Sequence, residues 1–102
     1  MYCEGINTIE MPDSITEMES GVFRYCRTLK QVKLSANLSA LPNELFADCN
    51  SLTDVVIPTK VEVIGSKAFS HCNSLTQLTI PEGVRTIQSS AFEYCTILTQ
   101  MI

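Results

Sequence analysis

The chain has 102 residues, enough for one domain, and 45% of them are hydrophobic, which predicts a buried core and not a disordered segment. Seven Lys and Arg stand against eleven Asp and Glu, and the formal net charge of -4 argues against nucleic acid or an anionic membrane surface as a partner. No apolar run approaches the roughly 18 to 20 residues that cross a bilayer, so we expect no membrane insertion.

A single repeating interval organises the whole chain. The five cysteines stand at positions 3, 26, 49, 72 and 95 and the four phenylalanines at 23, 46, 69 and 92, so the interval is the same in both series. Several columns of Leu, Ile, Val and Ala follow the same step. We therefore expect a single domain over 1–102, divided into a partial repeat 1–5, repeats 6–28, 29–51, 52–74 and 75–97, and a partial repeat 98–102.

The elements of one repeat are clearest in the third copy. Leu52–Ile57 reads L-x-x-V-x-I, which predicts a short strand with one face inward, and Pro58 ends it because proline cannot donate to a ladder. Val61 and Ile64 then point inward, in a second short extended piece or in an irregular turn. Ser66–Cys72 places Ala, Phe and Cys at i, i+1 and i+4, which predicts one helical turn. Such a unit buries its apolar side only by stacking on its neighbours.

A 20-to-29-residue unit that opens with L-x-x-L-x-L resembles the leucine-rich repeat, and I-P after the strand with A-F-x-x-C later resembles the BspA-like repeats of microbial cell-surface proteins. The resemblance implies a right-handed solenoid with a parallel β-sheet on the concave side and short helical turns and irregular segments on the other. It also implies adhesion or protein binding, a secreted or cell-surface location, and a host or cell-surface protein as partner. Gly65 is kept in one copy only, so we expect no left-handed backbone at that position.

The cysteine column is expected to fill the narrow side of each coil. Equivalent residues in stacked parallel coils lie about 4.8 Å apart with parallel side chains, whereas a disulfide needs converging ones, so neighbouring cysteines should stay reduced. A metal ladder or redox relay is the alternative, but zinc sites use close cysteine pairs or histidines, and His71 is the only histidine. We expect no metal and no cofactor.

The residue pattern gives little support for a catalytic site. A Ser-His-Asp or Cys-His site would have to use His71, which precedes the cysteine column at a surface position. The sequence holds no glycine-rich phosphate loop and no metal motif. We expect a non-enzymatic protein.

The outward residues of the strands form the candidate binding face on the concave side. They are mostly polar and include no aromatic ring: Thr8, Glu10, Gln31, Lys33, Asp54, Val56, Gln77, Thr79 and Gln100. They fit equally well a solvated sheet surface held by cross-strand pairs such as Glu10 with Lys33. A rival surface follows the predicted helical turns, with Arg24, Tyr25, Asp48, His71, Glu93 and Tyr94.

The last residues suggest a self-association edge. Leu98, Met101 and Ile102 belong to a strand with no successor in this sequence, and an open strand edge invites pairing, which predicts a homo-oligomer or a place in a longer array. Two alternatives to a binding module are a structural spacer and an intracellular scaffolding repeat without a ligand of its own. No signal or anchor is visible in this chain.

Overall fold

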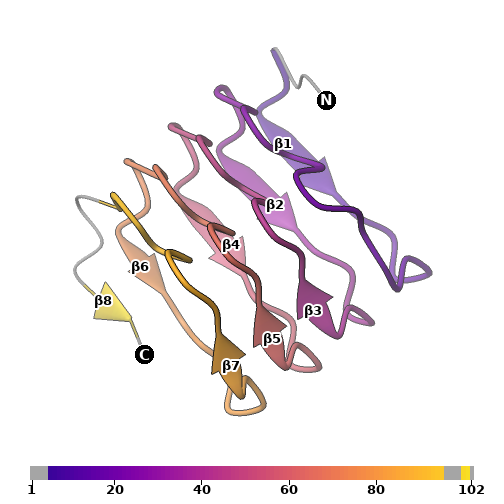
Figure 1. Ribbon diagram of the computed structural model, residues 1–102. Coiled ribbons are helices and arrows are strands. Elements are labelled where there is room, and N and C mark those ends of the chain that lie inside the picture. Colours follow the sequence, from indigo (N-terminus) through magenta and orange to yellow (C-terminus); the bar gives the residue numbers. More distant parts are fainter. Residues whose placement is uncertain (1–4, 96–99, 102) are drawn as a thin grey trace.

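The computed structural model describes residues 5–95 and 100–101, which form a stack of coils built from short strands and turns (Figure 1). Among these described residues, all strand pairs are parallel and fall into three sheets. The first contains β1 (Thr8–Glu10), β2 (Gln31–Lys33) and β4 (Asp54–Val56); the second contains β3 (Ala40–Leu41), β5 (Val63–Ile64) and β7 (Thr86–Ile87); the third contains β6 (Gln77–Leu78) and β8 (Gln100–Met101).

The strand register follows the sequence period. Thr8 pairs with Gln31 and Gln31 with Asp54, so each partner lies one repeat further along the chain. In the second sheet Ala40 pairs with Val63 and Val63 with Thr86, at the same step. The V-x-x-I segment therefore ends in a short strand in these coils, which decides between the two alternatives that the sequence left open.

The core lies between the first and second sheets and the turns, and it is built from the apolar columns. Leu29, Leu52 and Leu75 are completely buried. The four phenylalanines form one continuous ladder, in which the ring centroids of successive residues lie 5.7, 5.4 and 5.3 Å apart. Spacings of this size are favourable for aromatic pairs, so each ring packs on the ring of the adjacent coil.

The prediction of a helical turn after the second strand is wrong, because the described residues contain no helix there. The segment is a series of β-turns, in which Ala68 N–H donates to the Gly65 carbonyl, Ser70 to Lys67 and Cys72 to Phe69. The amide groups between these donors bond instead to the next coil, as Phe69 N–H does to the Ala91 carbonyl at 2.8 Å. A helix would direct all of these amides into the same coil, so stacking favours the turns.

These turns hold two columns of residues in the left-handed region. Gly21 belongs to the first column, and the others are not glycine: Glu44, Lys67 and Ser90 in the first column, and Tyr25, Asp48, His71 and Tyr94 in the second, with φ between 58° and 63°. Left-handed φ at the third residue is typical of a type II turn, which usually has Gly there. The coil-to-coil hydrogen bonds therefore maintain a conformation that these side chains disfavour.

Gly65 confirms the expectation that its position needs no left-handed backbone. It lies outside the residues with positive φ, and its role is a close approach between coils. A Cβ at Gly65 would lie 2.6 Å from the Asn43 backbone nitrogen and 2.6 Å from Asn43 Oδ1. Asn43 Oδ1 accepts a hydrogen bond from the Ser66 amide at 2.9 Å, which holds it in this place.

The concave face has one interruption. Strands β4 and β6 lie side by side in consecutive coils, yet among the described residues they belong to separate sheets (Figure 1). The same two coils are joined elsewhere, since β5 pairs with β7 and the turn amides bond across the boundary. The gap in the ladder is thus confined to the concave side.

Candidate functional site

The predicted face does carry the expected side chains at its surface. Of the nine candidates, Thr8, Glu10, Gln31, Lys33, Asp54, Val56 and Thr79 are exposed. The side chains of Gln77 and Gln100 lie outside the described part of the structure, although the backbones of both residues belong to strands. Inward residues such as Val32 and Val55 are buried between them, as strand alternation requires.

Two hollows lie next to each other along this face. The first, here called the polar hollow, measures about 420 Å³ and is lined by Thr8, Ile9, Glu10, Gln31, Val32, Lys33, Asp54 and Val56. The second, here called the β4–β6 hollow, measures about 500 Å³ and is lined by Asp54, Val55, Val56, Ile57, Thr59, Leu78, Thr79 and Pro81. Asp54 and Val56 line both hollows.

Two cross-strand side-chain contacts lie in the polar hollow, one of them an ion pair. Lys33 Nζ lies 3.7 Å from Glu10 Oε2, which confirms the predicted cross-strand pair. Gln31 Nε2 donates to Asp54 Oδ2 at 3.3 Å. The Glu10–Lys33 pair is largely exposed, and such pairs contribute roughly 0 to 1 kcal/mol, so it orders the surface more than it stabilises the fold.

The β4–β6 hollow is the apolar part of the face. Val56 is the large hydrophobic residue with the greatest exposure among those described, at 76%. It stands beside Pro81 and Thr79 of the next coil, at the point where the ladder between β4 and β6 is interrupted. Exposed apolar area at a concavity is a common feature of surfaces that bind another molecule.

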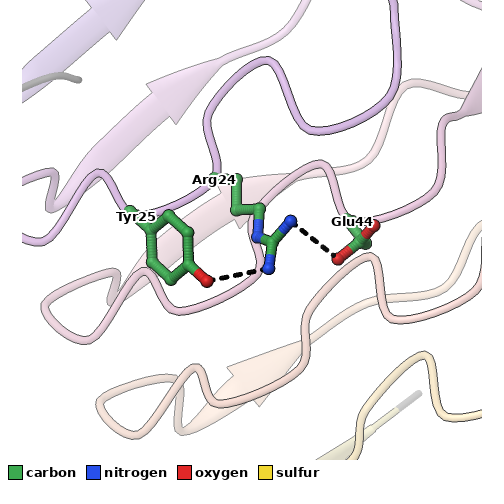
Figure 2. Close-up of polar contacts among 3 residues, drawn as sticks. All are labelled: Arg24, Tyr25 and Glu44. Atoms are coloured by element: carbon green, nitrogen blue, oxygen red, sulfur yellow. Dashed lines mark hydrogen bonds and ion pairs between the residues drawn. The ribbon is translucent and has the colours of Figure 1, made fainter. Parts of the chain in front are cut away.

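Figure 2 shows Arg24, a residue of the rival surface, with its neighbours Tyr25 and Glu44. Arg24 Nη2 donates to the Tyr25 hydroxyl at 2.7 Å, and Nη1 lies 3.4 Å from Glu44 Oε2. The guanidinium carbon also lies 4.6 Å from the centre of the Tyr25 ring. The cation is therefore satisfied by two neighbours within the protein, although its Nε is buried without a hydrogen-bond partner among the described residues.

Further along the same surface, His71 stacks on Tyr94 with ring centroids 4.7 Å apart. Tyr94 is 60% exposed. No described group of three or more His, Cys, Asp or Glu residues could hold a metal ion, and His71 has an aromatic ring as its neighbour. The structure brings together these rings, but it brings no nucleophile or acid next to the histidine in the described contacts.

The cysteines pack inside the turns and bond to the backbone. The thiols of Cys49, Cys72 and Cys95 are free, and each donates to a phenylalanine carbonyl of the preceding coil, at distances of 3.1, 3.2 and 2.9 Å. Burial raises the pKa of the Cys49 thiol to about 12. A hydrogen bond with Cys95 and burial together raise the pKa of Cys72. Cys49 and Cys72 are therefore protonated, inward groups.

Cys26 departs from the expectation that neighbouring cysteines stay reduced. It is buried and disulfide-bonded, so that expectation is wrong for this residue, while Cys49, Cys72 and Cys95 agree with it. Cys3 lies outside the described residues. The spacing argument assumed strictly parallel side chains, and this assumption does not hold at Cys26, since a disulfide requires converging ones.

The predicted self-association edge falls mostly outside the described residues, which include neither Leu98 nor Ile102. Met101 is part of β8 and pairs in parallel with Leu78 of β6. The structure offers no test of an intermolecular contact. Among the described residues, none forms a helix with the length and hydropathy that a membrane span requires.

The comparison with protein families gives the decisive result. The model described as BspA type leucine rich repeat region (6 copies) matches residues 1–102. The chain belongs to the BspA-type leucine-rich repeat family. This result confirms the resemblance and the solenoid class, and such repeats are generally protein-interaction modules without an enzymatic role of their own. No curated protein matches the chain.

Solved structures agree with this assignment. A leucine rich cell surface protein from Faecalibacterium prausnitzii is 34% identical over 94% of this chain, with a TM-score of 0.92, and a leucine-rich repeat protein from Bacteroides ovatus is 27% identical over 97%, with a TM-score of 0.91. The T. pallidum leucine rich repeat protein is 31% identical over 92%, with a TM-score of 0.89. The chain spans 25%, 26% and 44% of these three proteins, respectively.

Proposed function

We propose that this BspA-type leucine-rich repeat chain is a non-enzymatic adhesion module that binds a protein at a cell surface. Its binding face is the concave side, with Thr8, Glu10, Gln31, Lys33, Asp54, Val56, Gln77, Thr79 and Gln100. The domain comprises the four complete repeats and the two partial ones. The cell-surface setting is supported by the printed description of the Faecalibacterium prausnitzii relative.

One observation supports this face above the rival surface. The concave side has two adjoining hollows and a valine exposed to 76%, whereas the cation of the rival surface is already bound by Tyr25 and Glu44. A partner that covers Val56 gains apolar burial without breaking an ion pair. A partner on Arg24 would have to replace existing contacts.

A structural spacer is the second candidate. It is favoured by the pairing of Glu10 with Lys33 and of Gln31 with Asp54, because side chains that satisfy one another need no ligand. The two candidates differ in what a change at Val56 does: a spacer tolerates it, and a binding module does not.

Beads coated with the chain test the proposal on cultured epithelial cells. Val56→Glu places a carboxylate in the β4–β6 hollow and should reduce the number of attached beads at least about tenfold, since a partner would have to bury an unpaired charge. Ser39→Glu adds the same charge at an exposed position outside both hollows and should leave attachment unchanged. Far-UV circular dichroism checks that both variants fold.

Equal attachment of all three kinds of bead, or attachment no higher than that of uncoated beads, would contradict the proposal. The first result would move binding to another face, and the second would favour the spacer.

A further inference from the structure

We propose that the β4–β6 hollow takes an apolar side chain of an extended protein segment, and that Asp54 selects a Lys or Arg two residues away in the same segment. This inference rests on the proposed function and names the chemistry of the partner. It is drawn from the hollow, from the exposure of Val56 and from the charges on the concave face.

The residues that line the β4–β6 hollow favour an apolar side chain of the partner. Val55, Ile57 and Leu78 are buried and form the floor, while the exposed Val56 and the half-exposed Pro81 border it. Asp54 is the one charged residue of the lining, and the remaining residues are two threonines. An aliphatic or aromatic side chain is the group that gains most from such a site, since it exchanges water for apolar contact on several sides.

The size of the hollow sets the scale of the anchor. A volume of about 500 Å³ lies within the usual range of roughly 300 to 1,000 Å³ for small-molecule sites, so the hollow is large enough for one side chain of a partner. The hollow is lined by residues of two consecutive coils, from Asp54–Ile57 on one side and from Leu78, Thr79 and Pro81 on the other. An extended segment can therefore lie across it, with one side chain inserted.

The charge preference follows from the two carboxylates of the face. Glu10 has a cation within the protein, because Lys33 Nζ lies 3.7 Å away. Asp54 accepts a hydrogen bond from Gln31 Nε2, and no ion pair is found for it among the described residues. Asp54 thus has no cationic partner among the described residues, and it lies at the boundary of both hollows, where a basic side chain of a partner could form an ion pair with it.

The two-residue spacing between the apolar and the basic residue of the ligand follows from strand geometry. Asp54 and Val56 belong to the same strand and point to the same side, so their Cα atoms lie about 6.6 Å apart. Side chains two residues apart in an extended ligand have the same separation and direction. A ligand aligned with β4 therefore presents an apolar residue at one position and a Lys or Arg at the second position from it.

The net charge of the chain also favours a basic partner segment. A formal net charge of -4 attracts basic segments and repels acidic ones over distances comparable to the Debye length, about 8 Å at physiological ionic strength. Selection of a basic segment is therefore favoured both during approach and in the bound state.

Peptide selection provides the test. A random nonapeptide library displayed on phage is selected on the immobilised chain, and the enriched sequences are synthesised with a fluorescent label. We expect an apolar residue and a Lys or Arg at i and i+2 in the enriched set. Fluorescence anisotropy then gives the affinity of these peptides for the wild type and for four variants: Val56→Glu, Asp54→Asn, Ser39→Glu and Glu62→Gln.

The expected affinities separate the two halves of the site. Val56→Glu should weaken binding about tenfold or more, and Asp54→Asn about two- to fivefold, the effect of losing one exposed ion pair. Ser39→Glu and Glu62→Gln, the matched changes of charge outside both hollows, should change nothing. Replacing the basic residue of the peptide by Gln should weaken binding to the wild type and have no further effect on Asp54→Asn.

The outcomes distinguish this inference from the proposed function. Enriched peptides that depend on Val56 but show no basic residue, or bind Asp54→Asn as tightly as the wild type, would overturn the inference and leave the concave face as the binding site. Peptides that bind Val56→Glu normally, or the absence of any enriched peptide, would overturn both.

Discussion

Replacing Phe69 by Ala removes the central contact of the phenylalanine ladder. Phe69 is completely buried, and its ring centre lies 5.4 Å from that of Phe46 and 5.3 Å from that of Phe92. Truncation of a buried Phe costs about 3 to 5 kcal/mol, a total that includes about 0.5 to 1.5 kcal/mol for each aromatic pair lost. Since a domain of this size has roughly 5 to 15 kcal/mol of stability, the variant should lose a large fraction of it.

Urea unfolding followed by far-UV circular dichroism measures the change in the free energy of unfolding. Phe23→Ala is the matched control, because Phe23 is also buried but has one described ring neighbour, Phe46, at 5.7 Å. We expect Phe69→Ala to be the more destabilised by about 1 kcal/mol or more, the value of the additional aromatic pair, with an unchanged denaturant slope. Equal losses in the two variants would refute the reasoning, because they would show that the rings contribute as separate buried groups and not as a ladder.

Two further predictions concern the backbone contact at Gly65 and the buried thiols. Gly65→Ala should lower the free energy of unfolding by about 1 to 3 kcal/mol, because the added Cβ would lie 2.6 Å from the Asn43 backbone nitrogen. Gly83→Ala should lower it less, because the nearest atom there is 3.3 Å away. Thermal melting compares the two variants, and equal melting temperatures would contradict the close approach at Gly65. Burial raises the pKa of Cys49 from 9.0 to about 12, so its contribution to stability is fully present below about pH 9 and decreases as the pH rises toward 12. This thiol should lower the free energy of unfolding by up to about 1.4 kcal/mol for each pH unit in this range. Urea titrations at pH 8 and pH 10 measure the decrease, which should be smaller in Cys49→Ala than in the wild type. The same decrease in both proteins would argue against a buried, protonated thiol.

Much of the fold could be predicted because one sequence period determines both the strand register and the buried columns. The constant step between repeats gives the strand register, as the pairing of Thr8 with Gln31 and Asp54 shows, and it places the cysteine and phenylalanine columns inside. The same step identified the outward residues of the concave face and the Glu10–Lys33 pair. These features depend on which side of a strand a residue occupies, and alternation fixes that side.

The turns could not be predicted because the relevant forces act between coils. Lys67 and His71 have left-handed backbone with φ of 58° and 60°, and neither residue type signals it. Their conformation is maintained by amides that donate to the next coil, at 3.3 Å from Lys67 to Ser89 and 2.8 Å from His71 to Glu93. The interruption between β4 and β6 has the same origin, since it depends on how one coil sits on another.

The interruption between β4 and β6 is compatible with a stable stack because the coils on either side are joined in two other places. Val63 pairs with Thr86 in the second sheet, and Phe69 contacts the next coil through both its ring and its amide. In a solenoid each coil depends on its neighbours, so a boundary that lost every contact would separate the two halves. Here the missing pairing is limited to the concave ladder, and the core beneath it stays closed. A hollow of this kind can therefore differ between repeats of one array without weakening the array, provided that the phenylalanine ladder and the turn hydrogen bonds continue.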